Sequence, residues 1–474
     1  MKLLSITFLI TLITIVSVGQ SRRVAPGTEI KVSNAEAFDD RSVREMFDDA
    51  NSYSRRKFAE FEEKKVRFSE ALRLSTEQEK KQLAAKYAAM AETRTELSAE
   101  DIYYRGLLHW IAENLHGTAT SLAKYVEMSD ATSDKAQTAR SILVVIFAKQ
   151  KNFDEALSAY AAYGKNSPSR LTETARMNGE IAKAYLFEKD FAAASPFAER
   201  AYKASKALIA DPSSMARGLD ELLDAGMLVF ESYRDQNKLA EAESALLEMR
   251  ATAASVGSPS FYYYSADKLI TYQIESGRKA LGLETYLSTL IDIGKSFRSK
   301  EMATDLQARV RSREKHYKMM GEPAPELIGI DQWFPGERST LASMRGKVIL
   351  LDFWATWCGP CFDAFPHLAE WQLDFKDQGL VILGVTRYYG RAEGTSADEP
   401  NEIEFLKGFR SKYKLPYDFV VARGQQAQIQ YGATALPTAV LIDRKGVIRY
   451  LETGSSPSRL EDMRAVMLKL LAEE

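Results

Sequence analysis

Residues 353–361 read Phe-Trp-Ala-Thr-Trp-Cys-Gly-Pro-Cys and contain the only two cysteines in a chain of 474 residues. The stretch directly follows the apolar run Val-Ile-Leu-Leu at 348–351, which is typical of a buried strand. Cysteines that stabilise a fold are usually spread along a chain, whereas Cys358 and Cys361 are separated by only two residues. The pattern indicates reversible two-electron thiol chemistry.

Two other interpretations of the cysteine pair are open, and the sequence supports them less well. A structural zinc ion needs four ligands. The pair supplies two, and the four histidines are scattered along the chain. An inert disulfide is also conceivable, but closing so small a loop removes little entropy from the unfolded chain. We therefore expect no metal ion at this site.

The length and charge of the chain limit its class. A chain of 474 residues is too long for one ordinary domain, so two or more are expected. The formal net charge of -2 argues against a nucleic-acid partner.

The N-terminus resembles an export signal. Residues 1–19 begin with Met-Lys, continue with the apolar stretch 3–18 and end in a small-x-small motif, Ser-Val-Gly. The alternative is an uncleaved membrane anchor at 3–18, because Arg22 and Arg23 follow it closely. In both cases residues 20–35 form a linker, and the bulk of the chain is expected to be periplasmic or otherwise outside the cytoplasm, in an oxidising setting.

Residues 36–320 are predicted to be helical throughout, because apolar residues recur at helical spacing. Three predicted helix starts look alike, at 152–157, 190–194 and 238–242. This resembles tetratricopeptide-type helical hairpins, whose usual period is about 34 residues. An irregular helical bundle is the alternative.

Two segments of this helical region each allow two interpretations. The charged segment 40–97 is expected to be a solvated helix face, with a partner-binding helix as the alternative. The aromatic run 261–264 is expected to pack inside the helical array, with a peptide-binding surface as the alternative.

The pattern changes near residue 321. Four of the five tryptophans lie beyond it, and strands alternate with helices from there to the C-terminus. Strands are predicted at 347–354, 380–386, 417–421, 438–443 and 447–451, and helices at 359–376, 402–413 and 457–472. Ser458 and Glu461 are expected to form a capping box for the last helix. The order predicts an α/β fold with a mixed sheet flanked by helices.

Residues 321–474 resemble a thioredoxin-like domain, and within that fold the TlpA-like and AhpC/TSA group of exported bacterial thiol-disulfide proteins. The residues that carry the resemblance are spread in the expected order over the whole segment: 321–325, 346–348, 353–361, 436–438 and 441–443.

The cysteines have different expected roles. Cys358 is predicted to lie at a helix N-terminus, where free N–H groups favour its thiolate, and to be the nucleophile. Cys361, one turn further, is expected to be more buried and to resolve the mixed disulfide. Gly359 and Pro360 shape the turn between them.

The resemblance implies roles for further residues. Pro437 matches the cis-proline that faces the redox pair, and the backbone of Leu436 would pair with an extended substrate peptide, next to Thr438. Trp357 and Trp354 would flank the site.

Asp352 matches the buried acid behind the cysteines, which would accept the proton of the second cysteine. A strand-end aspartate without a catalytic role is the alternative. Asp363 and His367 are expected to be surface residues.

The chain also departs from the family pattern. Many exported reductases of this group carry a glutamate where Ala364 stands here. No proline stands at the place before Thr356 that a peroxidase would need, so peroxidase activity is not expected. The long polar loop at about 388–401 is interpreted as a solvated insertion, with a lid over the site as the alternative.

Together these features predict an exported thiol-disulfide oxidoreductase that reduces protein disulfides and exchanges electrons with a second thiol protein. The helical domain would recruit a partner. No bound cofactor is expected, because sulfur carries the electrons. The alternative is a helical scaffold protein with a redox-sensing thioredoxin-like appendage.

Overall fold

The computed structural model describes residues 40–128, 131–210 and 215–473. The predicted signal at 1–19 and nearly all of the region before the first helix, including the linker at 20–35, lie outside these residues. Within them, no helix combines the length and the apolar character needed to cross a bilayer.

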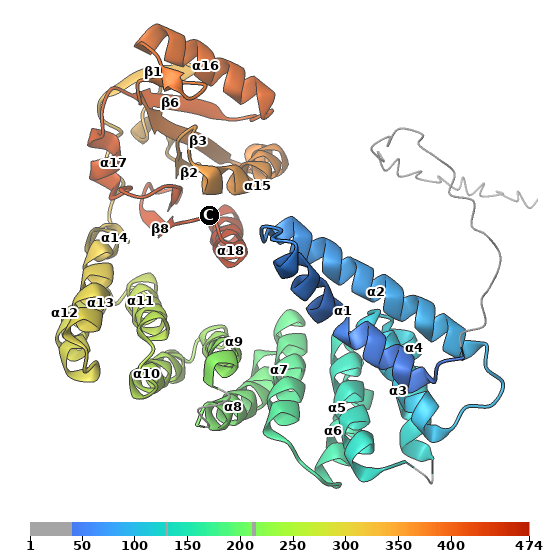
Figure 1. Ribbon diagram of the computed structural model, residues 1–474. Coiled ribbons are helices and arrows are strands. Elements are labelled where there is room, and N and C mark those ends of the chain that lie inside the picture. Colours follow the sequence, from blue (N-terminus) through green and yellow to red (C-terminus); the bar gives the residue numbers. More distant parts are fainter. Residues whose placement is uncertain (1–39, 129–130, 211–214, 474) are drawn as a thin grey trace, which may run out of the picture.

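The first part of the described chain is entirely helical, as predicted. Figure 1 shows its helices following one another in an arc that leads to the C-terminal sheet domain. The helices are α1 (Val43–Glu63), α2 (Glu70–Glu92), α3 (Ala99–Ile111), α4 (Leu115–Glu127), α5 (Ser133–Lys149), α6 (Phe153–Gly164), α7 (Leu171–Phe187), α8 (Phe191–Leu208), α9 (Met215–Arg234), α10 (Leu239–Ser255), α11 (Pro259–Glu275), α12 (Lys279–Ser296), α13 (Lys300–Ser312) and α14 (Glu314–Met319).

The same tight turn joins successive helix pairs of this array. Helices α6, α8, α10 and α12 each begin two residues after a residue with left-handed backbone geometry, namely Lys151, Lys189, Asn237 and Gly277. A left-handed residue ends a helix by letting the next N–H groups satisfy its last carbonyls. The N–H of Asn152, for example, donates to the carbonyl of Phe147 at 2.9 Å. The three predicted helix starts are thus confirmed, while the tetratricopeptide assignment stays a prediction.

The C-terminal part forms a six-stranded mixed sheet in the order β1-β6-β3-β2-β7-β8. Its central strands β2, β3 and β6 are parallel, and β7, β8 and β1 run antiparallel to their neighbours. The strands are β1 (Ile330–Phe334), β2 (Val348–Phe353), β3 (Leu380–Arg387), β6 (Asp418–Ala422), β7 (Thr438–Ile442) and β8 (Ile448–Thr453). The flanking helices are α15 (Gly359–Phe375), α16 (Glu399–Lys412), α17 (Gln426–Tyr431) and α18 (Pro457–Ala472). The predicted thioredoxin-like α/β fold is confirmed.

The two faces of this sheet belong to two different apolar cores. Side chains alternate along β2, so Leu351 and Phe353 point to one face and Leu350 to the other. The first face is continuous with the core of the helical array, through residues such as Tyr317 and Tyr431. The second face carries both cysteines and packs against α15 and α18. The core of the array therefore continues into the face of the sheet opposite the redox pair, where α14 contacts α17 and β8.

Buried charges also join the helical array to the sheet domain. Arg313, which is 5% exposed, pairs with Asp267 of α11 at 3.0 Å and with Glu452 of β8 at 2.5 Å. A second, more exposed ion pair joins Lys268 of α11 to Asp462 of α18 at 3.4 Å. Burying a charge is costly unless it is paired, so the contacts of Arg313 favour one relative placement of the two parts.

Two predictions at the C-terminal helices need correction. The capping box of Ser458 and Glu461 is wrong, because Ser456 is the N-cap of α18 and accepts from the N–H of Arg459. Pro457 explains the difference, since proline favours the first helical position and leaves the residue before it as the cap. Helix α16 begins at Glu399, before the predicted residue 402, because Asp398 caps it.

Candidate active site

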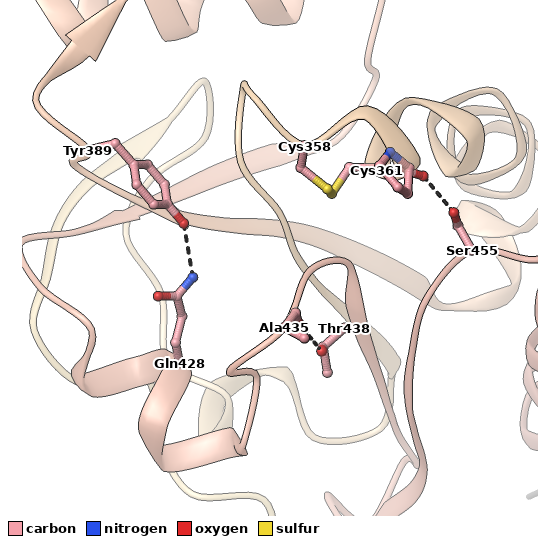
Figure 2. The surroundings of a disulfide bond; sticks show 8 residues. Cys358, Cys361, Tyr389, Gln428, Ala435, Thr438 and Ser455 are labelled. Carbon is pink, nitrogen blue, oxygen red and sulfur yellow. Dashed lines mark hydrogen bonds between the residues drawn. A yellow bond between two sulfur atoms is a disulfide. The ribbon is translucent and has the colours of Figure 1, made fainter. Parts of the chain in front are cut away.

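Cys358 and Cys361 form a disulfide at the start of α15, with their Cα atoms 5.4 Å apart. Figure 2 shows the bridge beside the loop that carries Ala435 and Thr438. Cys358 is the N-cap residue of the helix and is 4% exposed, whereas Cys361 is fully buried. The expected difference in burial is confirmed, and it makes Cys358 the sulfur that an incoming molecule reaches first.

The sequence around the pair explains this position. Strand β2 ends at Phe353, and Pro360 favours the first turn of a helix because it needs no hydrogen-bond acceptor there. The unpaired N–H groups of this first turn stabilise negative charge, so they favour a thiolate at Cys358 once the bridge is reduced. Gly359, Pro360 and Trp357 are exposed around it, Trp357 by 60%. These three residues border the approach to the sulfur.

The loop before β7 forms a second side of the site. The Leu436–Pro437 peptide bond is cis, as predicted. Thr438 is buried and its hydroxyl donates to the carbonyl of Ala435 at 2.7 Å, so its side chain closes the loop and does not face outward. Leu436 remains half-buried.

The segment after β8 fastens this loop to the cysteine turn, which the sequence did not reveal. The N–H of Gly454 donates to the carbonyl of Pro437 at 2.8 Å. The hydroxyl of Ser455 donates to the carbonyl of Pro360 at 2.6 Å (Figure 2). Two neighbouring residues thereby hold the predicted proline loop and the predicted cysteine turn together.

The helical array touches the same loop at its other end. His316 of α14 donates from Nε2 to the carbonyl of Gly432 at 3.0 Å, five residues before Pro437. Its Nδ1 lies 2.7 Å from Nη1 of Arg313 and therefore accepts. Burial, followed by the charge of Arg313, lowers the pKa of His316 to about 4. The imidazole is therefore uncharged at physiological pH.

Asp352 lies in β2 and is 3% exposed, which confirms its predicted burial. Desolvation raises the pKa of its carboxyl to about 7. The alternation of β2 points it to the face that carries Cys358 and Cys361. A carboxyl with this proton affinity can take and return a proton near neutral pH. Trp354, which was expected to flank the site, is instead fully buried on the same face beneath α15.

A further aromatic residue next to the site comes from the polar loop. The ring of Tyr389 meets that of Trp357 edge-to-face at 5.4 Å, and its hydroxyl accepts from the amide of Gln428 at 3.2 Å (Figure 2). The guanidinium of Arg387 lies 4.0 Å from the Tyr389 ring centre. Tyr389 thus extends the aromatic surface next to Trp357, and no sequence motif predicted this position.

The start of the polar loop is anchored, so it is more than a solvated insertion. Buried Glu402 accepts from the N–H of Tyr389 at 2.8 Å and from that of Gly390 at 2.9 Å. Further along, β4 (Arg391–Ala392) and β5 (Thr395–Ser396) form a short hairpin. Only this outer part corresponds to the predicted solvated segment.

The remaining predicted residues lie where the sequence placed them. Asp363 and His367 are both exposed on α15, as predicted. Ala364 is 4% exposed, so the position where related reductases carry a glutamate is buried and apolar here.

Comparison with known proteins shows one matching family model, similar curated relatives and similar solved structures. The Redoxin family model matches residues 319–467, which include the whole six-stranded sheet and both cysteines. Thiol-disulfide oxidoreductase ResA of Geobacillus kaustophilus (strain HTA426) is 31% identical over 142 residues, 30% of this chain and 74% of the relative. ResA of Bacillus anthracis is 30% identical over 135 residues, 28% of this chain and 70% of the relative. A solved thiol:disulfide interchange protein from Bacteroides sp. is 25% identical, covers 32% of this chain and 91% of its own, and has a TM-score of 0.26.

Proposed function

Because this chain belongs to the ResA-type thiol-disulfide oxidoreductases, we propose that it reduces disulfide bonds of protein substrates outside the cytoplasm, with Cys358 as the nucleophile. The observation that carries the proposal is the place of Cys358 at the N-terminus of α15, beside the cis-Pro437 loop and bordered by exposed Trp357.

The proposed reaction starts from the reduced dithiol. The thiolate of Cys358 attacks one sulfur of the substrate disulfide, and the other substrate sulfur leaves as a thiolate that takes a proton from water. Cys361 then gives its proton to the carboxylate of Asp352 and attacks the Cys358 sulfur. The second substrate thiolate leaves, and the enzyme keeps the disulfide, so two electrons have moved from the enzyme to the substrate. A dithiol protein has to restore the reduced state.

The surroundings suit a polypeptide substrate. Leu436 lies at the rim of the site before a strand, so an extended peptide could pair with its backbone. Trp357 and Tyr389 offer an aromatic surface beside the reacting sulfur. Aromatic side chains favour contact with peptides because they bury a large area with few rotatable bonds.

We assign the recruitment of a partner protein to the helical array. A groove of about 460 Å³ runs between α5, α7, α8 and α9. Its rim carries charged side chains of both signs, including Arg176, Lys183 and Asp224. A groove with such a rim can select a partner through charge complementarity.

The experiment uses two cysteine variants and a synthetic peptide closed by one disulfide. Reduced Cys361→Ser should accumulate a mixed disulfide with the mass of the peptide added, because the resolving sulfur is gone. Cys358→Ser should form no adduct and should not turn over. Equal turnover by Cys358→Ser and the unaltered chain would exclude the proposed nucleophile.

A second experiment separates the partner from the chemistry. Trapping with Cys361→Ser in the native extracytoplasmic extract is compared with the same variant carrying Arg176→Glu and Lys183→Glu. The charge reversals should remove at least one trapped protein and leave the peptide reaction unchanged. An identical set of trapped proteins would contradict a recruiting role for the groove.

A further inference from the structure

Three buried polar atoms on the disulfide side of the sheet have no hydrogen-bond partner among the described residues. They are Oδ2 of Asp352, Nε1 of Trp354 and the hydroxyl oxygen of Tyr417. Their residues are 3%, 0% and 2% exposed. Unpaired buried polar groups cost stability, so three of them on one side of a sheet call for an explanation.

The three residues that carry these atoms lie around one glycine. Gly384 of β3 stands opposite Asp352 in the β2–β3 register. A Cβ atom on Gly384 would lie 3.0 Å from Nε1 of Trp354 and 3.3 Å from the ring of Tyr417. The missing side chain therefore lets the indole and the phenol rest against the sheet at the position next to Asp352.

The chemistry of the three groups suits the ionised acid better than the neutral one. An indole N–H donates and cannot accept, and a phenol O–H donates readily. A neutral carboxyl needs few donors, whereas a carboxylate in an apolar core needs them strongly. Two buried donors beside one buried acid thus serve the ionised form of that acid.

We propose that the Tyr417 hydroxyl and the Trp354 indole N–H are positioning groups that stabilise the Asp352 carboxylate while it exchanges a proton with Cys361. The role of that proton rests on the proposed function. The donors lower the cost of ionising Asp352 without touching the substrate.

Within the part of the chain that the structure describes, no charged group shifts the pKa of Asp352, which burial alone raises. In the neighbouring strands Gly384 and Ala439 stand beside it, and α15 contributes Cys361. Helix α18 contributes four apolar side chains to this core: Leu460, Met463, Met467 and Leu470. Apart from Asp352, Arg410 of α16 is the one described residue whose charge acts on Tyr417, and its Nε donates to the Tyr417 carbonyl at 2.9 Å.

Packing alone does not account for the hydroxyl. The Tyr417 ring contacts Phe419 at a centroid distance of 6.1 Å, and a phenylalanine would keep that contact. Burial raises the pKa of Tyr417 and the negative charge of Asp352 raises it further, so the two groups interact.

The test titrates Asp352 in the oxidised full-length protein labelled with ¹³C at the aspartate carboxyls, with Asp352→Asn identifying the signal. Tyr417→Phe should raise the proton affinity of Asp352 about tenfold, as expected when an ionised carboxyl loses one available hydrogen-bond donor. Trp354→Phe should act in the same direction. The control is Tyr450→Phe, a buried tyrosine of the same core whose hydroxyl already donates to the carbonyl of Arg459 at 3.3 Å.

An unchanged titration of Asp352 in Tyr417→Phe, or an equal change in Tyr450→Phe, would overturn the proposal. The measurement needs no turnover, so it stands or fails independently of the proposed function. A second measurement connects the two donors to catalysis. In Tyr417→Phe, the rate at which Cys361 resolves a preformed mixed disulfide should fall about tenfold at acidic pH and stay unchanged at alkaline pH. An unchanged rate at acidic pH would remove the link to catalysis.

Discussion

Replacement of Asp352 by asparagine should make the stability of the protein less dependent on pH. Burial raises the pKa of the Asp352 carboxyl from its ordinary 3.8 to about 7. Between these two values the folded protein keeps a proton that the unfolded chain has released. The free energy of unfolding of the unaltered chain therefore falls as pH rises through this window and is constant above it.

The size of the effect follows from the same shift. Each pKa unit corresponds to about 1.4 kcal/mol, so ionised Asp352 lowers the free energy of unfolding by about 4 kcal/mol at pH 8. Asparagine has nearly the same shape and carries no charge. Asp352→Asn should match the unaltered protein near pH 4 and exceed it by up to about 4 kcal/mol near pH 8.

The assay is guanidinium unfolding of both oxidised proteins at several pH values, followed by tryptophan fluorescence. Four of the five tryptophans lie beyond residue 321, so the signal reports mainly on the sheet domain. Subtracting the free energies of unfolding of the two proteins at each pH cancels the contributions of the other titrating groups. A difference that stays constant from pH 4 to pH 8 would refute the assignment of a raised pKa to Asp352, and with it the proton acceptor of the mechanism.

Three further outcomes test other contacts. Arg313→Met removes the cation that pairs with the carboxylates of Asp267 and Glu452, and should lower the free energy of unfolding by about 3–5 kcal/mol. The control is Lys318→Met, which breaks an exposed pair with Glu314. It should lower the free energy of unfolding by less than about 1 kcal/mol in the same denaturation assay. Glu402→Gln removes one of the two carboxylate acceptors that hold the start of the polar loop, so trypsin should cleave after Arg391 faster than in the exposed control Glu404→Gln. Equal cleavage rates in the two variants would contradict the role of Glu402 in holding the loop. Trp357→Ala should change stability by less than about 0.5 kcal/mol because the ring is 60% exposed, yet should raise the KM for the disulfide peptide, and an unchanged KM would remove Trp357 from the binding surface.

The sequence predicted the elements around the cysteines well, because those elements carry strong local signals. The apolar run of β2, the proline-started α15 and the periodic α18 all appear within one or two residues of their predicted bounds. Strand β1 was missed because it is short, half polar and at the edge of the sheet, where it pairs with β6 from far along the chain. No local pattern specifies such a pairing.

The contrast between local sequence signals and long-range contacts also explains which site residues could be predicted. Cys358, Cys361 and Asp352 could be found because they belong to one continuous stretch of sequence. Tyr389 and Ser455 could not, because their roles depend on where the fold brings a polar loop and a strand end. Trp354 was misplaced because the alternation of β2 continues through it and turns its ring into the core.

The most direct test of the account is the reduction potential of the Cys358–Cys361 pair, measured by equilibrating the purified chain with glutathione buffers of known ratio. A reductase of protein disulfides should give a value near or below about -250 mV. A value near about -120 mV would mark an oxidant with a stabilised dithiol form, and would contradict the proposed direction of electron flow.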